Sequence, residues 1–311
     1  MLAEGGQAHS VAGRAAFRMR RRSALGLYIR LNSWAWRRLP GRLRHTRLMR
    51  DYGTILHRVV RQAERRQFSG TFFFRNRPQL ELMCRLIERK AVGSTLNLAI
   101  LGCSIGAEIY SILLTVRSAR PDLKVSVWAV DNSAEVLSVA RGAVYTKELN
   151  EVVGSSIFER MTGREFEELF ERGGDVARVR PSFREGINWH LGDAGDPDLM
   201  HITGPQDIVV ASNFLCHMNP AEAENCLRNL ARIVKRGGHL FVTGVDLDVR
   251  AKVASELGWQ PILDLIEEIH EGDPALRRDW PCKWWGLEPL NKSRADWKMR
   301  YASVFRLNED G

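Results

Sequence analysis

The stretch that decides the fold is LNLAILGCSIGAEIYSILL, residues 96–114. An apolar run over 96–101 ends at Gly102, and the spacing of apolar residues over 105–118 predicts a helix. Glycines at 102 and 106 allow a ligand to approach the backbone of this strand-to-helix turn, unless the turn is a plain left-handed one. The loop is neither GxGxxG nor a P-loop, so a nicotinamide cofactor is disfavoured.

Outward from this stretch, apolar runs alternate with helical patterns. We expect strands over 125–130, 187–191, 207–211 and 240–245, and helices over 78–90, 134–141 and 221–235, the last stopped by the glycines at 237 and 238. Residues 145–186 are charged and lack strong β runs, so we interpret them as an insertion. The alternation predicts an α/β fold with an open, mostly parallel sheet covered on both faces.

Charge is distributed very unevenly over the 311 residues. Residues 1–66 hold 16 arginines, no lysine and three acids, a charge of +13, and the rest of the chain therefore carries −4 of the total +9. This excludes a uniformly basic nucleic-acid binder. Five cysteines without a CxxC pair exclude a disulfide scaffold and a familiar zinc cluster, and no metal is expected. No long apolar run or secretory signal is present, so we expect a cytoplasmic protein.

The basic N-terminal segment has its own pattern. Residues 1–13 are expected to be disordered, and over 14–66 apolar residues such as Leu27, Leu31 and Trp34 recur at helical spacing. The pattern predicts two or three helices broken near Pro40-Gly41. Three interpretations stay open: a solvated helical extension, a surface for polyanions such as anionic lipid, acidic protein or nucleic acid, and an organellar transit peptide.

The loops that follow the predicted strands carry the candidate ligand groups, because ligands bind at the carboxyl ends of the strands in such sheets. Asp131 ends the second strand and is suited to the hydroxyls of a ribose, since Ser133 is the better helix cap. Asp193, in Gly192-Asp193-Ala194, is either an adenine acceptor or a helix cap. His217 is a base, a positioning donor or a helix-entry residue.

Several segments resemble, in the correct order, the motifs of the CheR-type chemotaxis-receptor methyltransferases. These segments cover roughly residues 70–245 and are Thr71-x-Phe73-Phe74-Arg75, Cys103-Ser104-x-Gly106-x-Glu108-x-Tyr110-Ser111, Ala129-x-Asp131, Ala140-Arg141-x-x-Val144-Tyr145 with Glu148-Leu149, Val179-Arg180, Asn213 with Leu215, and Lys235-x-Gly237-Gly238-x-Leu240-Phe241. The resemblance implies a Rossmann-like, seven-stranded methyltransferase sheet with a helical N-terminal extension and a small inserted subdomain.

The resemblance also implies a domain organisation and a cofactor, S-adenosylmethionine. The expected parts are a basic helical arm (1–66), a helical lead-in with the TxFFR motif (67–94), a cofactor-binding core with its insertion (95–250), and a Trp-rich segment completing the sheet (251–311). Arg75 would hold the methionine carboxylate, Glu108 would lie beside the ammonium, Asp131 would bind the ribose and Asp193 the adenine. The other implied pocket residues are Gly102, Cys103, Ser104, Gly106, Ala194, Asn213 and Phe214.

Arg75 and His217 are the candidate catalytic residues, and His217 stands where the family has tyrosine. Ser212 replaces an arginine, Ala107 an acid, and Gly244-Val245-Asp246 the usual His-Ser-Glu. The function that the resemblance implies is methyl transfer from S-adenosylmethionine to a protein glutamate. The alternatives are a methyltransferase for a small molecule or nucleic acid, and a non-catalytic cofactor-binding scaffold. A carboxylate acceptor is already ionised at neutral pH and needs no base, whereas an amine or hydroxyl would use His217.

The C-terminal segment is rich in tryptophan, with Trp280, Trp284, Trp285 and Trp297 close together. They are interpreted as core and edge cover or as an aromatic wall for the acceptor. Residues 283–290 and 300–307 are predicted to form an antiparallel pair at the sheet edge. An acidic patch before them is expected to be a solvated helix end and comprises Glu267, Glu268, His270, Glu271 and Asp273.

Overall fold

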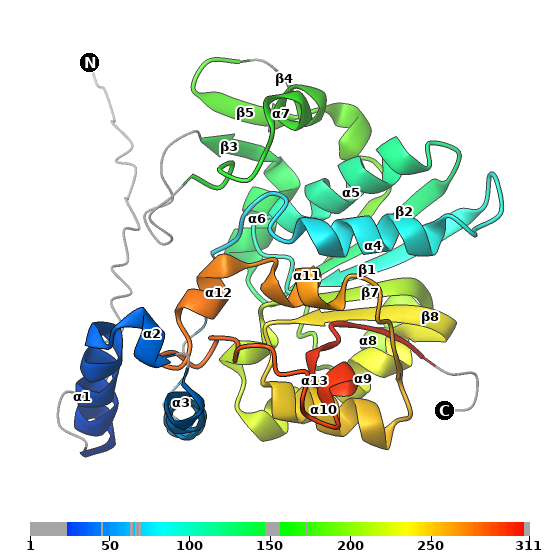
Figure 1. Ribbon diagram of the computed structural model, residues 1–311. Helices are drawn as coiled ribbons and strands as arrows, with labels where there is room; N and C mark the ends of the chain where they lie inside the picture. The colour runs from blue at the N-terminus through cyan, green and yellow to red at the C-terminus, as the bar shows by residue number, and fades with distance from the viewer. Residues whose placement is uncertain are drawn as a thin grey trace, which may run out of the picture.

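The computed structural model describes residues 24–44, 46–62, 65, 67, 70–146, 156–171 and 173–307. Its centre is a seven-stranded sheet in the order β6-β2-β1-β7-β8-β10-β9 (Figure 1). The first five strands of this order run parallel, and the last two pair antiparallel. The predicted α/β fold with a seven-stranded methyltransferase-type sheet is confirmed.

The strand bounds lie close to those predicted. They are β1 (Thr95–Leu101), β2 (Lys124–Asp131), β6 (Ile187–Leu191), β7 (Gln206–Ser212), β8 (Val234–Thr243), β9 (Gln260–Pro261) and β10 (Val304–Arg306). In β1, Leu98 and Ile100 pack with one hydrophobic cluster, whereas Ala99 and Leu101 pack with another. This alternation places a core on each face of the sheet, which is why the central strands are apolar throughout.

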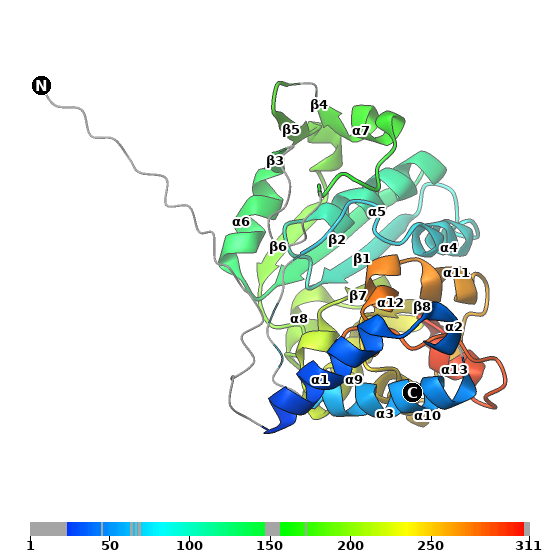
Figure 2. The ribbon, with the colours of Figure 1, turned by 60° about the vertical axis from the view of Figure 1, so that its left-hand side comes forward.

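Helices cover both faces of the sheet (Figures 1 and 2). On one face lie α4 (Arg77–Ile87), α5 (Ala107–Ala119) and α6 (Ala134–Gly142), and on the other lie α8 (Leu199–Thr203), α9 (Pro220–Ile233), α10 (Leu247–Glu256) and α13 (Trp297–Tyr301). Short helical segments η1 (Pro181–Phe183), η2 (Leu215–His217), α11 (Ile266–Glu271) and α12 (Pro274–Arg278) connect them.

Two boundaries near the sheet edge were predicted incorrectly. Helix α9 ends at Ile233, and the glycines at 237 and 238 lie inside β8 instead of stopping the helix. The backbone of these glycines pairs with Leu307, through Gly237 N to Leu307 O (3.1 Å) and Leu307 N to Gly238 O (3.0 Å). Residues 283–290 form no strand, and the edge pair is β9 with β10, because Pro261 and Gln260 supply the partners of Phe305 and Arg306.

The segment predicted as an insertion folds as a small sheet of its own. It holds β3 (Val144–Thr146), α7 (Gly163–Leu169), β4 (Phe170–Glu171) and β5 (Val176–Val179), with the strands in the antiparallel order β3-β5-β4. Aromatic rings join it to the TxFFR motif, since Phe73 lies 5.2 Å from Tyr145 and 5.3 Å from Phe170 between ring centroids. Glu148 and Leu149, quoted for the resemblance, lie outside the described residues.

The described residues of the basic arm form three helices, α1 (Ala24–Arg38), α2 (Gly41–Arg44) and α3 (Arg47–Val60), so the predicted break near Pro40-Gly41 is confirmed. The apolar set named from the sequence does not face inward in α1. Leu27, Leu31 and Trp34 are 52%, 58% and 57% exposed, whereas Ile29 and Trp36 are buried. Residues 1–13 lie outside the described part of the chain.

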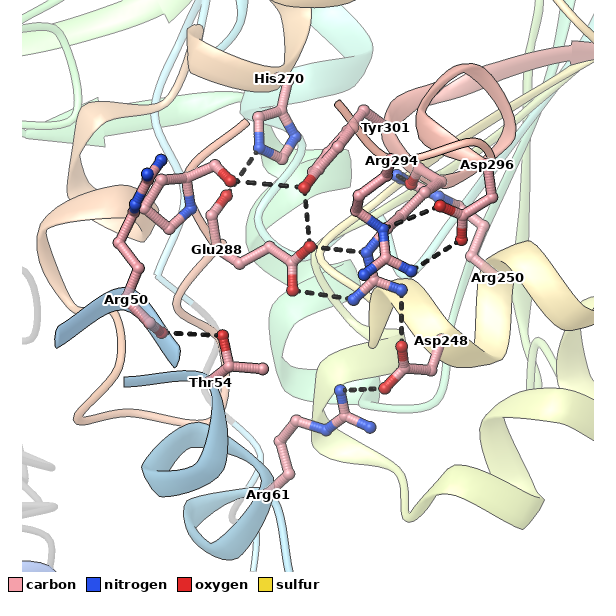
Figure 3. A network of polar contacts seen from close by, with 12 residues as sticks. Arg50, Thr54, Arg61, Asp248, Arg250, His270, Glu288, Arg294, Asp296 and Tyr301 are labelled. Atoms are coloured by element: carbon pink, nitrogen blue, oxygen red, sulfur yellow. Dashed lines mark hydrogen bonds and ion pairs between the residues drawn. The ribbon is translucent and has the colours of Figure 1, made fainter. Parts of the chain in front are cut away.

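The arm packs on the Trp-rich C-terminal segment. Trp36 meets Trp280 edge to face at 5.5 Å, and Ile29 and Leu56 share a buried cluster with Trp284. A polar network adds to this contact (Figure 3): Arg61 of α3 donates to Asp248 of α10 (2.9 Å), and Arg300 donates to both Asp248 (2.6 Å) and Glu288 (2.6 Å). The described helices of the arm are therefore part of the folded body rather than a solvated extension.

Candidate functional site

A cleft of about 800 Å³, counted up to its open mouth, lies where β1, β2, β6 and β7 end. Nearly all sequence-predicted site residues line it, together with residues from the lead-in and the neighbouring loops: Gln67, Gly70, Thr71, Arg75, Gly102, Cys103, Ser104, Glu108, Asp131, Asn132, Gly192, Asp193, Ala194, Ser212, Asn213, Phe214, His217 and Met218.

The loop after β1 has two left-handed glycines with different roles. Gly102 (φ 65°) faces the cleft, and a Cβ there would lie 2.6 Å from the ring of Phe214. Gly106 (φ 89°) is not a lining residue of the cleft: it begins α5, where a Cβ would lie 3.0 Å from the Cβ of Ala140. Gly102 therefore shapes the cleft directly, and Gly106 lets α5 approach α6 closely.

Asp131 is fixed at the end of β2 by backbone hydrogen bonds. Ser104 N donates to Oδ2 (2.8 Å) and Ser133 N donates to Oδ1 (3.1 Å), while the Ser133 hydroxyl caps α6 by accepting from Val136 N. The carboxylate is 7% exposed and reaches the cleft. Sequence reasoning left Asp131 free for a ligand; in the structure it also holds the glycine loop against β2.

Asp193 and Ala194 form the side of the cleft beyond Asp131. The Asp193 side chain is exposed, and its Oδ1 accepts a hydrogen bond from Gly195 N at 2.7 Å. This bond stabilises the loop, and Asp193 also lines the cleft. Ala194 is buried at 7% exposure and provides an apolar wall.

Arg75 is held by a carboxylate that sequence reasoning assigned to a solvated patch. Arg75 Nε donates to Asp273 Oδ2 (2.5 Å), and Arg160 donates to Asp273 Oδ1 (3.2 Å) and to the Arg75 carbonyl (2.6 Å). Burial opposes ionisation of Asp273, but the two guanidinium groups hold its pKa below the usual range. Asp273 is 4% exposed and His270 is 2% exposed, so the prediction of a solvated acidic patch is wrong for both residues.

Glu108, in the first turn of α5, lies between this cleft and a second cavity beneath the TxFFR motif. Burial raises the pKa of Glu108, and the positive charge of Arg75 opposes that rise. A cation bound beside Glu108 would restore its usual ionisation. Glu108 and Arg75 thus present one acidic and one basic group at the same end of the cleft.

The loop after β7 contributes polar side chains to the cleft. Asn213 has φ 60°, and its backbone N donates to Thr243 O at 2.9 Å. Among the described residues, Asn213 Oδ1 is buried without a hydrogen-bond partner, and the Ser212 hydroxyl faces Glu108 and opposes the rise of its pKa. Buried polar atoms without partners are costly, and both residues line the cleft. They are therefore suited to a polar ligand.

His217 lies at the mouth of the cleft, with its ring edge to face against Trp284 at 5.2 Å. The backbone on both sides of it is held by Arg65, which donates to Cys216 O (3.2 Å) and Met218 O (2.7 Å). Arg65 also donates to Asp246 Oδ2 at 2.9 Å. Sequence reasoning missed this role of Arg65, because its partners lie about 150 and 180 residues away.

Comparison with known proteins decides the family. Residues 69–249, more than half of the chain, match the SAM-binding domain of CheR methyltransferases. The chain belongs to the CheR methyltransferase family. The resemblance stated from the sequence motifs is confirmed, and S-adenosylmethionine is the cofactor of this domain.

Three relatives of this CheR family member show how far the likeness extends. A probable biofilm formation methyltransferase, WspC of Pseudomonas aeruginosa, is 28% identical over 62% of this chain and 44% of its own length. A probable chemotaxis protein methyltransferase of Rhizobium etli is 24% identical over 68% and 82%. An uncharacterised 104.1 kDa protein of Rhodobacter capsulatus is 26% identical over 68% of this chain and 20% of its own length. The chain thus spans less than half of two of these relatives.

Two further findings bear on what this CheR domain contains. Within the described ranges, no cluster of three or more His, Cys, Asp or Glu side chains is arranged to hold a metal ion. No helix in the part of the chain that the structure describes is long and apolar enough to cross a bilayer.

Proposed function

We propose that the protein transfers the methyl group of S-adenosylmethionine to the carboxylate of a protein glutamate. The observation that carries this proposal is the order of groups along the cleft. The strand order β6-β2-β1-β7 sets Asp193 with Ala194 at one end of the cleft, followed by Asp131 and then the Gly102 loop, and Glu108 adjoins Ser212 of β7 and Arg75 at the other end. This order corresponds to the adenine, ribose and methionine parts of the cofactor.

In this proposal each residue binds one part of the cofactor. The planar guanidinium of Arg75, oriented by Asp273, binds the methionine carboxylate, and Glu108 binds the ammonium. Asp131 accepts the ribose hydroxyls, while Asp193 and Ala194 contact the adenine. The middle of the cofactor is lined by Gly102, Cys103, Ser104 and Phe214. Asn213 Oδ1 accepts a hydrogen bond from the bound cofactor. Gly106 supports the loop from behind.

The chain's contribution to the reaction is alignment and exclusion of water. The cofactor, when bound, supplies a sulfonium methyl group that is already strongly electrophilic. A glutamate acceptor has an ordinary pKa of about 4.3 and is ionised at neutral pH, so no general base is required. His217, fixed by Trp284 and by the Arg65 bonds on either side, positions the acceptor at the cleft mouth.

Partners and location complete the proposal. The names of two relatives mention chemotaxis and biofilm formation, and we propose a protein acceptor by analogy. We also propose that residues 14–66 bind a polyanionic surface that brings the enzyme to its acceptor. The cytoplasmic location, and the division into 1–66, 67–94, 95–250 and 251–311, stay predictions.

The test uses methyl-labelled S-adenosylmethionine with the full chain and a cell extract. Label released from protein by mild alkali indicates a carboxyl ester, as proposed. Alkali-stable label on protein, or label on nucleic acid or a small molecule, would instead favour His217 as a base and contradict the glutamate assignment. Cofactor binding by calorimetry without any transfer would support a non-catalytic scaffold.

A matched pair of variants tests the role of His217. His217→Tyr restores the residue type typical of the family, whereas His217→Ala removes the ring. If His217 only positions the acceptor, the tyrosine variant keeps ester formation and the pH profile of the rate has no step near 6.5. A wild-type rate of methyl transfer that falls as the pH drops through this range, together with loss of activity in both variants, would identify His217 as a base.

A further inference from the structure

Helix α1 has two apolar faces. One face packs inward through Ile29 and Trp36, which are 3% and 4% exposed. The other carries Leu27, Leu31 and Trp34, spaced one to two turns apart and each more than half exposed. In the part of the chain that the structure describes, this second face stays largely open to solvent. Figure 2 shows α1 at the front of the molecule, at the outer edge of the arm.

The surroundings of this outer face are strongly basic. Residues 24–62 contain nine arginines and one acid, Asp51. The exposed ones that form no ion pair with any described residue are Arg37, Arg38, Arg42, Arg47, Arg50 and Arg58. The Arg38 guanidinium lies 4.0 Å from the centroid of the Trp34 ring. Arg38 thus places a cation directly on the apolar row of α1.

We propose that the outer face of α1, defined by Leu27, Leu31 and Trp34 with the flanking arginines, binds the surface of an anionic lipid bilayer. This choice rests on the proposed polyanion contact of residues 14–66 and specifies its partner. A helix that lies in a membrane interface inserts leucine and tryptophan at the level of the acyl boundary and keeps arginine at the phosphates.

The same face fits the other polyanions less well. A nucleic acid or an acidic peptide would pair with the arginines but would leave the apolar side chains of Leu27 and Leu31 in water. A bilayer interface accommodates both kinds of group at once. An apolar row beside unpaired arginines is therefore the combination that favours lipid.

The position of α1 gives such binding a functional meaning. α1 packs on α3, and the chain that follows α3 contains Arg65, which holds the loop of His217 at the cleft mouth. A bilayer under α1 would thus hold the cleft near acceptors located at the membrane.

The experiment is flotation of the full chain with vesicles of phosphatidylcholine alone or mixed with phosphatidylglycerol. The wild type is expected to float only with the anionic vesicles, and less so as salt is raised. A variant with Leu27→Ser, Leu31→Ser and Trp34→Gln is expected to bind these vesicles about tenfold more weakly or worse. The matched control, Val92→Ser with Leu257→Ser, removes exposed apolar groups elsewhere and keeps wild-type binding.

Three results would overturn the proposal. If the triple variant binds anionic vesicles with wild-type affinity, the contact belongs to the arginines alone. A wild-type oligomer that becomes monomeric in the triple variant would assign the face to a second copy of the chain. If the wild type also binds duplex DNA, and the triple variant loses DNA binding together with vesicle binding, the face would instead be assigned to nucleic acid.

Controls separate this proposal from the proposed function. S-adenosylmethionine affinity and the unfolding temperature of the triple variant are expected to match the wild type, because the substituted side chains are exposed and lie outside the cleft. Flotation needs no methyl acceptor. Loss of vesicle binding with intact cofactor binding therefore tests α1 alone, whatever the outcome of the methylation assay.

Discussion

Replacement of Asp131 tests the cofactor site most directly. In the structure its carboxylate accepts two backbone N–H groups, from Ser104 at 2.8 Å and Ser133 at 3.1 Å, and still reaches the cleft. If it also accepts the ribose hydroxyls, Asp131→Ala removes a charged hydrogen bond that contributes about 1.5–3 kcal/mol. The expected weakening of S-adenosylmethionine binding is therefore roughly 10- to 150-fold.

The same substitution also affects the free enzyme. The two backbone N–H groups lose their acceptor, which costs about 1–3 kcal/mol for each group that stays buried and unpaired. Calorimetric titration with S-adenosylmethionine measures the first effect, and thermal unfolding without the cofactor measures the second. Asp131→Asn keeps an acceptor oxygen but loses the charge, so it is expected to be intermediate in both.

A matched control separates the two effects. Asp122 lies just before β2, accepts from Gly93 N and pairs with Arg120. Asp122→Ala removes a carboxylate that also stabilises a backbone turn, but at the opposite end of the strand from the cleft. It is expected to lower stability without changing cofactor affinity. Asp131→Ala binding S-adenosylmethionine within twofold of the wild type would refute the role assigned to Asp131.

Three further predictions concern Arg65, Gly102 and two buried histidines. Arg65→Ala is expected to leave S-adenosylmethionine affinity unchanged and to slow methyl transfer about tenfold or more, with partial recovery in Arg65→Lys; a full rate in labelled-extract assays would argue against it. Gly102→Ala is expected to lower both the unfolding temperature and the cofactor affinity, because the new Cβ would lie 2.6 Å from the ring of Phe214. The control is Gly93→Ala, since Gly93 is also left-handed but has open space around it, so this variant reports the backbone strain alone. Burial lowers the pKa of His57 and of His270 to about 4, so between pH 6.5 and 4 the unfolded chain binds protons that the folded chain does not. Stability is therefore expected to fall as pH drops through this window, by roughly 3 kcal/mol for each histidine. Urea unfolding at pH 7 and 4.5 checks this, with His57→Gln losing part of the dependence; equal stability at both pH values would contradict it.

The parts of the molecule that the sequence predicted well depend on local patterns. The strand over 96–101, the Gly102 turn and Asp131 at the end of the next strand follow from apolar runs and from the rule that ligands gather at strand ends. The cleft accordingly contains nearly every predicted residue, and only Gly106 lies behind it.

The parts that were missed depend on contacts between distant segments. Asp273 is in a run of acids typical of a solvated helix end, and only the fold shows that Arg75 and Arg160 surround it. The inward face of α1 was ambiguous for a different reason. Two apolar rows share that helix, and periodicity alone does not say which row finds a partner.

The Arg65 contact has a practical consequence for protein engineering. One guanidinium joins the end of the arm to Cys216 O, Met218 O and Asp246, and Trp284 closes the same corner from the C-terminal side. Three segments that are far apart in the chain therefore form one joint, a single packed contact around Arg65. A truncated enzyme that begins at the family-matched residues would lose that joint, and a chimera intended to change acceptor choice must exchange the arm, the His217 loop and the Trp-rich segment together.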